Sequence, residues 1–267
     1  MEQLTALGTG YAVATRCYTT CFTISDGKEH FMIDTGGGSG VLTNLEKLGI
    51  SVAQVHHIFL SHRHTDHILG AVWMLRMIGH SMEKGQYQGQ LHLYCHQSIA
   101  EGLVEMCRFM LPDRLLKLFG TQILFHCLSD GLTFDILDRK TTFFDTRSKK
   151  TLQYGVSIQL KNGKQFTYLG DEPYRQDCAD YAMQVDYLMH EAMCLERQEE
   201  QYHPHRIQHS TVKDAAQCAA QLQVGSLILH HTEDKNLQQR KAAYTAEAQQ
   251  YFSGTVYVPD DLETIML

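Results

Sequence analysis

One short stretch of the chain concentrates side chains that could bind a metal. Segment 61–67 reads Ser-His-Arg-His-Thr-Asp-His, so three histidines and one aspartate fall within six residues. In an extended loop, side chains two residues apart point the same way. His62, His64 and Asp66 should therefore converge, and His67 should reach the same space from the start of the next element. Imidazole nitrogen and carboxylate oxygen are ligands for zinc and similar cations. The segment predicts a metal site; the plainer alternative is a polar loop with surface histidines.

The flanking sequence predicts the elements that would position these side chains. An apolar run at 55–60 precedes the segment, and an apolar helical pattern at 68–78 follows it. This order is typical of a buried strand, a tight loop and a helix.

The remaining chain predicts an alternation of strands and helices. Expected strands of the first half lie at 4–7, 21–24, 31–34 and 91–94, and expected helices at 41–48 and 97–119, the latter broken at Pro112. The second half is expected to restart as strands at 123–127, 141–144, 156–160, 165–169, 187–190 and 227–229, with helices at 211–222 and 237–252. No linker composition divides the two halves, so we expect a single domain over residues 1–267.

Composition limits the classes of protein and of partner. With 267 residues, 43% of them hydrophobic, the chain can bury a sizeable core. A net charge of −7 lacks the electrostatic footprint of a strong nucleic-acid binder. No apolar run approaches the roughly 20 residues of a membrane helix, and the start Met-Glu-Gln-Leu-Thr lacks a signal-peptide layout. We therefore expect a cytoplasmic protein without a membrane partner.

The eight cysteines give little sign of a metal or redox site. They are scattered and form no CxxC pair, which favours reduced and mostly buried thiols. Cys17 and Cys21 could pair or bind metal, but CxxxC alone is a weak signal.

Several motifs together resemble one known family. Segment 61–67 resembles the HxHxDH signature of the metallo-β-lactamase superfamily. His-Glu-Ala at 190–192, with Met193 replacing a threonine, resembles the His-Glu-Ala-Thr motif of its RNase Z-like branch, and 209–211 resembles the later His-Ser-Thr motif. The resemblance covers most of the chain. It implies an α/β (α+β) fold, namely the four-layer αββα metallo-β-lactamase sandwich, and a homodimer.

The resemblance also implies further metal ligands. Asp171 follows an apolar strand, where the family places a carboxylate that bridges two metals; a turn-forming aspartate is the alternative. His231 lies where the family places its last histidine, although strand alternation cannot separate it from His230. The implied ligands are His62, His64, Asp66, His67, Asp171 and His231. They would hold one or two divalent ions, with zinc expected and manganese or iron possible.

One position departs from the family pattern. Where the family usually has its remaining histidine, this chain has Arg147. Arginine stays protonated and offers no lone pair to a metal. The site built on His62 and His64 would lack one ligand unless Asp145 supplies it, so we expect two unequal metal sites. If Arg147 points toward the metals, it would bind an anionic group of the substrate.

The same resemblance implies the catalytic residues. Asp66 would orient the attacking water, and Glu191 would orient His209, which would assist the leaving oxygen. The structural alternative is that Glu191 caps a local structure and that His209, through Ser210, caps the following helix.

The expected function is metal-dependent hydrolysis of a phosphodiester, on a small anionic or phosphodiester substrate. One alternative is transfer-RNA 3′ processing by an RNase Z. Against it, segment 147–171 has no room for the long arm with which true RNase Z enzymes grip transfer RNA. A second alternative is a catalytically weakened metal-binding or regulatory protein of the same fold, which the arginine at position 147 favours.

Overall fold

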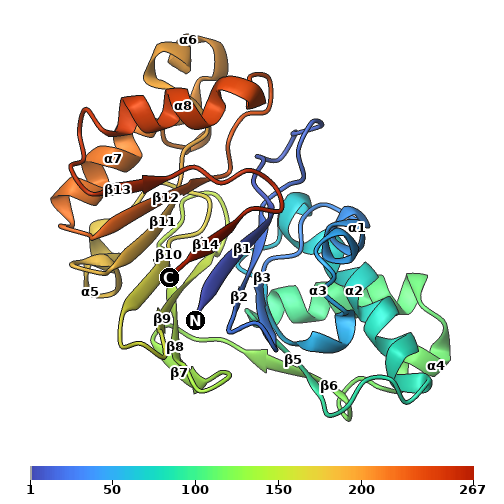
Figure 1. Ribbon diagram of the computed structural model, residues 1–267. Coiled ribbons are helices and arrows are strands. Elements are labelled where there is room, and N and C mark those ends of the chain that lie inside the picture. The colour runs from blue at the N-terminus through green and yellow to red at the C-terminus, as the bar shows by residue number, and fades with distance from the viewer. Residues whose placement is uncertain (1) are drawn as a thin grey trace. The chain divides into compact units, whose positions relative to one another are not determined.

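The structure, a computed structural model, describes residues 2–267 and divides into two compact units. The first unit comprises the chain up to Gly8, Tyr18–Leu128 and Asp261–Leu267, and the second comprises Thr9–Cys17 and Ser129–Asp260. Each unit is built on one seven-stranded sheet (Figure 1).

The sheet of the first unit joins both ends of the chain to its first half. Its strand order is β14 (Thr264–Met266), β1 (Gln3–Gly8), β2 (Cys21–Ser25), β3 (His30–Ile33), β4 (Val55–Phe59), β5 (Leu91–Cys95) and β6 (Ile123–Cys127). Pairing is antiparallel from β14 to β3 and parallel from β3 to β6. The parallel strands therefore all end at the same edge of this sheet.

Helices of the first unit cover the apolar face of its sheet. They are α1 (Gly40–Lys47), α2 (Thr65–Glu83), α3 (Gln97–Met110) and α4 (Asp113–Leu116), together with the short η1 (Val52–Gln54). Apolar side chains of α2 such as Met74, Leu75 and Ile78 join a core cluster with Ile58 and Leu93 of the strands. Burial of this apolar stripe, more than helix propensity, holds α2 on the sheet.

The second unit repeats this arrangement with its own sheet and helices. The strand order is β13 (Thr255–Tyr257), β12 (Ser226–His230), β11 (Tyr187–Glu191), β10 (Gln165–Tyr168), β9 (Tyr154–Gln159), β8 (Lys140–Asp145) and β7 (Leu132–Asp135). Pairing is parallel from β13 to β10 and antiparallel from β10 to β7. Its helices are α5 (Ala179–Ala182), α6 (Glu199–Tyr202), α7 (Val212–Gln221) and α8 (Leu237–Ala248), with η2 (Gln176–Cys178), η3 (Glu196–Gln198) and η4 (Pro204–Ile207).

Most expected elements are present, with three differences. The strand at 123–127 pairs in the sheet of the first unit, so the second half does not restart there. The helix after the histidine-rich segment begins earlier, at Thr65, because His64 is its N-cap residue. The short strands β7, β13 and β14 were not expected, since three or four residues carry too little periodicity. The expected break at Pro112 is confirmed between α3 and α4.

Two compositional expectations can be compared with the structure. All eight cysteines are free thiols in the described chain, and five of them are buried. None of the helices within residues 2–267 has the length and apolar composition that crossing a bilayer requires.

A close backbone contact fixes the start of α2 against the turn after β3. The amide of Thr35 donates to the carbonyl of His67 at 2.9 Å, and the amide of Gly70 donates to that of Gly36 at 2.9 Å. A β-carbon at Gly70 would lie 2.0 Å from the carbonyl oxygen of Thr35. Only glycine allows this approach, which positions the first turn of α2 and its histidine and aspartate.

We therefore expect Gly70→Ala to lower the free energy of unfolding by about 1–3 kcal/mol, because the turn or the helix must shift to admit the methyl group. Denaturant unfolding followed by circular dichroism measures this. Gly102→Ala in α3 is the matched control, since nothing lies within 4 Å of its β-carbon position. It should raise the stability by about 0.5–1 kcal/mol through helix propensity. Equal effects of the two substitutions would contradict the close contact.

Candidate metal and hydrolytic site

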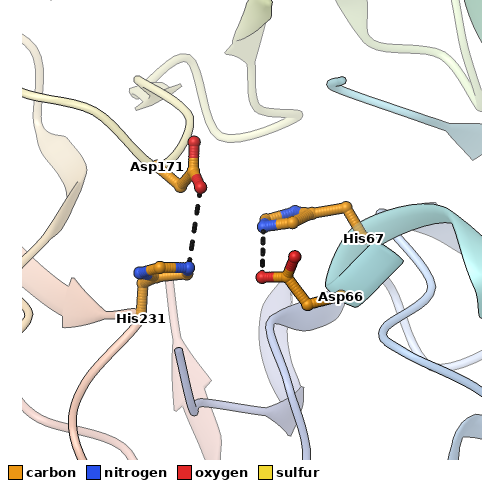
Figure 2. A group of neighbouring side chains, drawn as sticks. All are labelled: Asp66, His67, Asp171 and His231. Atoms are coloured by element: carbon orange, nitrogen blue, oxygen red, sulfur yellow. Dashed lines mark ion pairs between the residues drawn. The ribbon is translucent and has the colours of Figure 1, made fainter. Parts of the chain in front are cut away.

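The first unit supplies the histidine-rich segment between β4 and α2. His62 and His67 are fully buried and Asp66 nearly so. The ring nitrogens His62 Nε2 and His64 Nδ1 are 2.9 Å apart. The carboxylate of Asp66 lies 3.2 Å from His67 Nε2, and Figure 2 shows these two side chains turned toward each other. The segment therefore contains two close pairs, His62 with His64 and Asp66 with His67.

Asp34, at the turn after β3, orients this segment. Its carboxylate accepts hydrogen bonds from the amide and the hydroxyl of Ser61, at 2.8 and 2.7 Å, and lies 2.8 Å from His67 Nδ1. A carboxylate at Nδ1 leaves Nε2 of His67 as the nitrogen available to a metal, an arrangement common behind metal-binding histidines.

The electrostatics of this segment favour a positive charge. Burial alone would lower the pKa of His67, but the charges and hydrogen bonds of Asp34 and Asp66 raise it well above its ordinary value. The same two carboxylates would favour a bound cation.

In the second unit, three parallel strands end in residues of the expected site. Asp171 follows β10 and Gly170, Glu191 is the last residue of β11, and His231 follows β12. His231 Nε2 lies 3.6 Å from the Asp171 carboxylate (Figure 2). His230 instead packs its ring against Tyr168, with the centroids 5.2 Å apart. The backbone of His231 has φ of 55°, so the chain leaves the strand here and turns this ring toward Asp171.

The spacing of these atoms suits a tetrahedral metal. Two ligand atoms that are each about 2.0–2.1 Å from a tetrahedral zinc lie roughly 3.3 Å apart. The three pairs measure 2.9, 3.2 and 3.6 Å. Each pair therefore lies at about the spacing of two ligands of one zinc-like ion.

A second group of polar side chains lies beside His231. Its ring stacks on that of His209, with the centroids 4.9 Å apart. His209 Nδ1 is 3.5 Å from the carboxylate of Glu191, and Lys150 donates a hydrogen bond to His209 Nε2 at 3.1 Å. This places the proton of a neutral His209 on Nδ1, facing Glu191.

The surroundings of His209 favour its protonated form. Burial acts to lower the pKa of His209, but its hydrogen bond and charge interaction with Glu191, helped by Asp171, raise the pKa above the ordinary value despite Lys150. Glu191 also accepts a hydrogen bond from the amide of Ser210. The structural role considered for Glu191 is therefore present in part. One of its carboxylate oxygens accepts from the amide of Ser210, and the other faces His209. The residue that caps α7 is Thr211, not Ser210.

Arg147 lies on an exposed turn after β8. Its guanidinium pairs with Asp130 at 2.6 Å and with Asp145 at 2.9 Å. Two carboxylates therefore already engage the side chain, and a substrate phosphate would have to compete with them. Asp145 is held in the same pairing.

Two residues near the expected site were missed as participants by sequence reasoning. Lys150 belongs to a basic run that suggests a solvated surface, and no spacing rule connects it to a histidine 59 positions later. Gln153 donates to the carboxylate of Asp171 and orients it. Neither residue type carries a metal or catalytic signal by itself.

Comparison with known proteins agrees with this geometry. The family model described as the beta-lactamase superfamily domain matches residues 30–232. The chain therefore belongs to this superfamily, and it has the metallo-β-lactamase fold that its motifs predict. The metallo-beta-lactamase fold protein YhfI from Bacillus subtilis superposes with a TM-score of 0.78 at 17% identity, over 99% of this chain and 98% of that one.

The relatives narrow the class to the RNase Z-like branch. The Ribonuclease Z of Parabacteroides distasonis is 23% identical over 301 aligned positions, which cover 94% of each chain. The short form of human tRNase Z superposes with a TM-score of 0.76 at 19% identity, over 99% of this chain and 98% of that one. The chain is a metal-dependent hydrolase of this branch, as expected from its motifs.

The two adjacent histidines after β12 can be separated by metal content. His231→Ala should reduce the metal retained after dialysis, because it removes the imidazole beside Asp171. His230→Ala should retain the metal of the unsubstituted protein, because its ring packs in the sheet. Elemental analysis of both purified variants measures this, with circular dichroism as the check on folding. Metal loss only from His230→Ala would reverse the assignment.

Proposed function

We propose that the chain is a phosphodiesterase that hydrolyses its substrate by attack of a water molecule. The single observation that carries the proposal is the row Glu191–His209–Lys150 beside His231 and Asp171. It combines metal donors, a proton carrier and a cationic group in one unit. A phosphodiester needs all three: an activated water, a donor for the leaving oxygen and a positive charge for the phosphoryl oxygens.

The proposed metal ligands are those that the family motifs imply. They are His62, His64, Asp66, His67, Asp171 and His231, assigned from the family motifs together with the donor spacing inside each unit. When bound, a divalent cation such as zinc would lower the pKa of a water and stabilise negative charge on the phosphoryl group. We propose zinc because nitrogen and oxygen donors at this spacing suit it; manganese and iron are the other candidates.

The proposed roles of the residues follow from their contacts. Asp66 orients the water through its carboxylate. Glu191 holds the His209 ring, so that a protonated His209 can deliver a proton to the departing oxygen. In the protonated form, Nε2 of His209 carries a proton and no longer accepts from Lys150. The ammonium of Lys150 can then bind a phosphoryl oxygen beside this nitrogen. Arg147 could reach an anionic group only by leaving its two carboxylate partners.

We further propose unequal affinities for two metal ions, because an arginine occupies the position of the family's remaining histidine. After dialysis against a weak chelator, elemental analysis should find close to one metal ion per chain, and readdition should fill a weaker second site. Two ions of equal affinity would contradict this. The ion that is lost first should be the one that depends on His64.

Hydrolysis of a chromogenic phosphodiester tests the reaction. Asp66→Ala should abolish turnover, and chelation should do the same to the unsubstituted protein, reversibly on addition of zinc. Asp138→Ala is the matched control, since this carboxylate is 91% exposed and pairs only with Lys161 in the described residues. Full activity of Asp66→Ala would rule out the proposed mechanism.

Transfer-RNA 3′ processing is the second candidate function. Relatives that carry the name Ribonuclease Z match nearly the whole chain, which weakens the expectation of a small substrate. Against this candidate, β9 and β10 form a hairpin closed by a short turn, so residues 147–171 contain no inserted arm. In the same assay series, accurate cleavage of a precursor transfer RNA would favour RNase Z, and hydrolysis of the chromogenic ester alone would favour a smaller substrate.

Three further proposals carry over from the sequence: a single domain, from the lack of a linker composition; a cytoplasmic location, from the composition; and a homodimer, from the family resemblance. Light scattering of the purified protein measures the third. A monomer at all concentrations would overturn it.

A further inference from the structure

A cavity of about 340 Å³ opens in the first unit beside the N-terminal half of α2. Its walls include Gly38 after β3, Leu69, Val72, Trp73 and Arg76 of α2, and Met110 at the end of α3. The lining is mostly apolar, with one guanidinium. This volume is at the small end of the range for sites of small organic ligands.

The cavity adjoins the metal-binding end of α2. Gly37, in its wall, lies so close to the helix start that a β-carbon there would be 3.6 Å from the Cα of Asp66. Asp66, Leu69, Trp73 and Arg76 are spaced at i, i+3, i+7 and i+10, which places them along one stripe of the helix. Trp73 is two turns beyond Asp66, or about 10 Å along the axis. The cavity thus extends along α2 away from Asp66.

Arg76 is a cation without a counter-charge. Its side chain is half-buried at the wall of the cavity. Within residues 2–267 the guanidinium makes neither an ion pair nor a hydrogen bond. Arg114 of α4, by contrast, pairs with Glu83 of α2 at 3.1 Å. In a chain of net charge −7, a guanidinium left unpaired beside an apolar cavity is complementary to an anion.

Trp73 provides a flat apolar surface next to this charge. It is 44% exposed, although an indole of this size buries well in cores, and it is the single tryptophan of the chain. Indole rings stack on nucleobases because every base has a π-face, and each such stack contributes about 1–3 kcal/mol. Arg76 is three residues further along the same face.

We propose that this cavity binds one nucleotide unit of the substrate, with the base stacked on Trp73 and a phosphate paired with Arg76. The choice of a nucleotide rests on the proposed phosphodiesterase function. A planar apolar ring joined to an anion matches both halves of the lining, whereas a purely aliphatic ligand would leave Arg76 without a partner. An alkyl phosphodiester would pair with Arg76 through its phosphate but would leave the indole of Trp73 without a ring to stack on. A nucleotide or oligonucleotide therefore fits the lining better.

The single tryptophan makes the proposal directly measurable. Chelator-treated protein is titrated with adenosine monophosphate, with adenosine and with inorganic phosphate, and Trp73 emission is followed. We expect saturable quenching by the nucleotide, weaker binding of adenosine and no quenching by phosphate. Arg76→Gln should weaken nucleotide binding about tenfold and leave adenosine unchanged. Arg114→Gln, which alters a paired arginine of the same unit, should bind like the unsubstituted protein.

Substitution of Trp73 removes the fluorescent probe, so nucleotide binding by the Trp73 variants is measured by calorimetry. Trp73→Phe should still bind the nucleotide, and Trp73→Ala should lose most of its affinity, with circular dichroism confirming that both fold. Absence of nucleotide binding, or unchanged affinity in Arg76→Gln, would overturn the proposal. So would emission that shifts with protein concentration and not with ligand, because a second copy of the chain would then cover the cavity.

The titration is independent of catalysis, because it is performed without metal. Nucleotide binding together with full activity of Asp66→Ala would support the proposed nucleotide site and reject the proposed catalytic mechanism. Hydrolysis that depends on Asp66, without nucleotide binding, would do the reverse.

Discussion

The buried carboxylate of Asp34 is the contact on which the first unit's site depends. It accepts two hydrogen bonds from Ser61 and faces His67 Nδ1, so one side chain joins the end of β3 to both ends of the histidine-rich loop. A fully buried carboxylate is costly unless each oxygen is engaged. The loop conformation that satisfies Asp34 is also the one that turns His67 Nε2 outward. Structural and chemical demands on this loop are therefore met by the same geometry.

The expected site residues share one topological position. In the first unit they follow β4, which is parallel to β3 and β5, and in the second they follow the parallel neighbours β10, β11 and β12. The carboxyl ends of parallel strands meet at one edge of a sheet, where loops are free to vary without disturbing the core. Segments far apart in sequence, such as those of Asp171, Glu191 and His231, are thereby placed next to one another. This placement also brings in Lys150, whose role has no sequence signature.

Sequence reasoning recovered the long elements and missed the short ones. The strand, loop and helix around 55–78 carry strong periodicity, and the structure has them. The strands β7, β13 and β14 are too short to produce a period, and they exist because neighbouring strands offer them hydrogen bonds. The assignment of 123–127 to the sheet of the second half was wrong. Which sheet a strand joins depends on which edge strand is free to pair with it, and here β6 pairs with β5. In the sequence, Trp73 and Arg76 look like an ordinary helix surface. Only the structure shows that the C-terminal end of α3 lies beside them and forms a cavity.

By itself, the sequence predicted the superfamily and the hydrolase class, which the comparisons confirm, and a metal-binding role for the histidine-rich loop. It could do so because the histidines and the aspartate lie within six consecutive residues. It also predicted that Arg147 stands where the family usually has its remaining histidine, and an arginine offers no lone pair to a metal. Tertiary structure alone decided that His231 and not His230 faces Asp171, that Lys150 contacts His209, and that Arg147 pairs with two carboxylates. The reason is physical. Alternation along a strand fixes only that adjacent side chains point to opposite faces. The left-handed backbone at His231 and the loop around Lys150 depend instead on packing between segments that are distant in sequence.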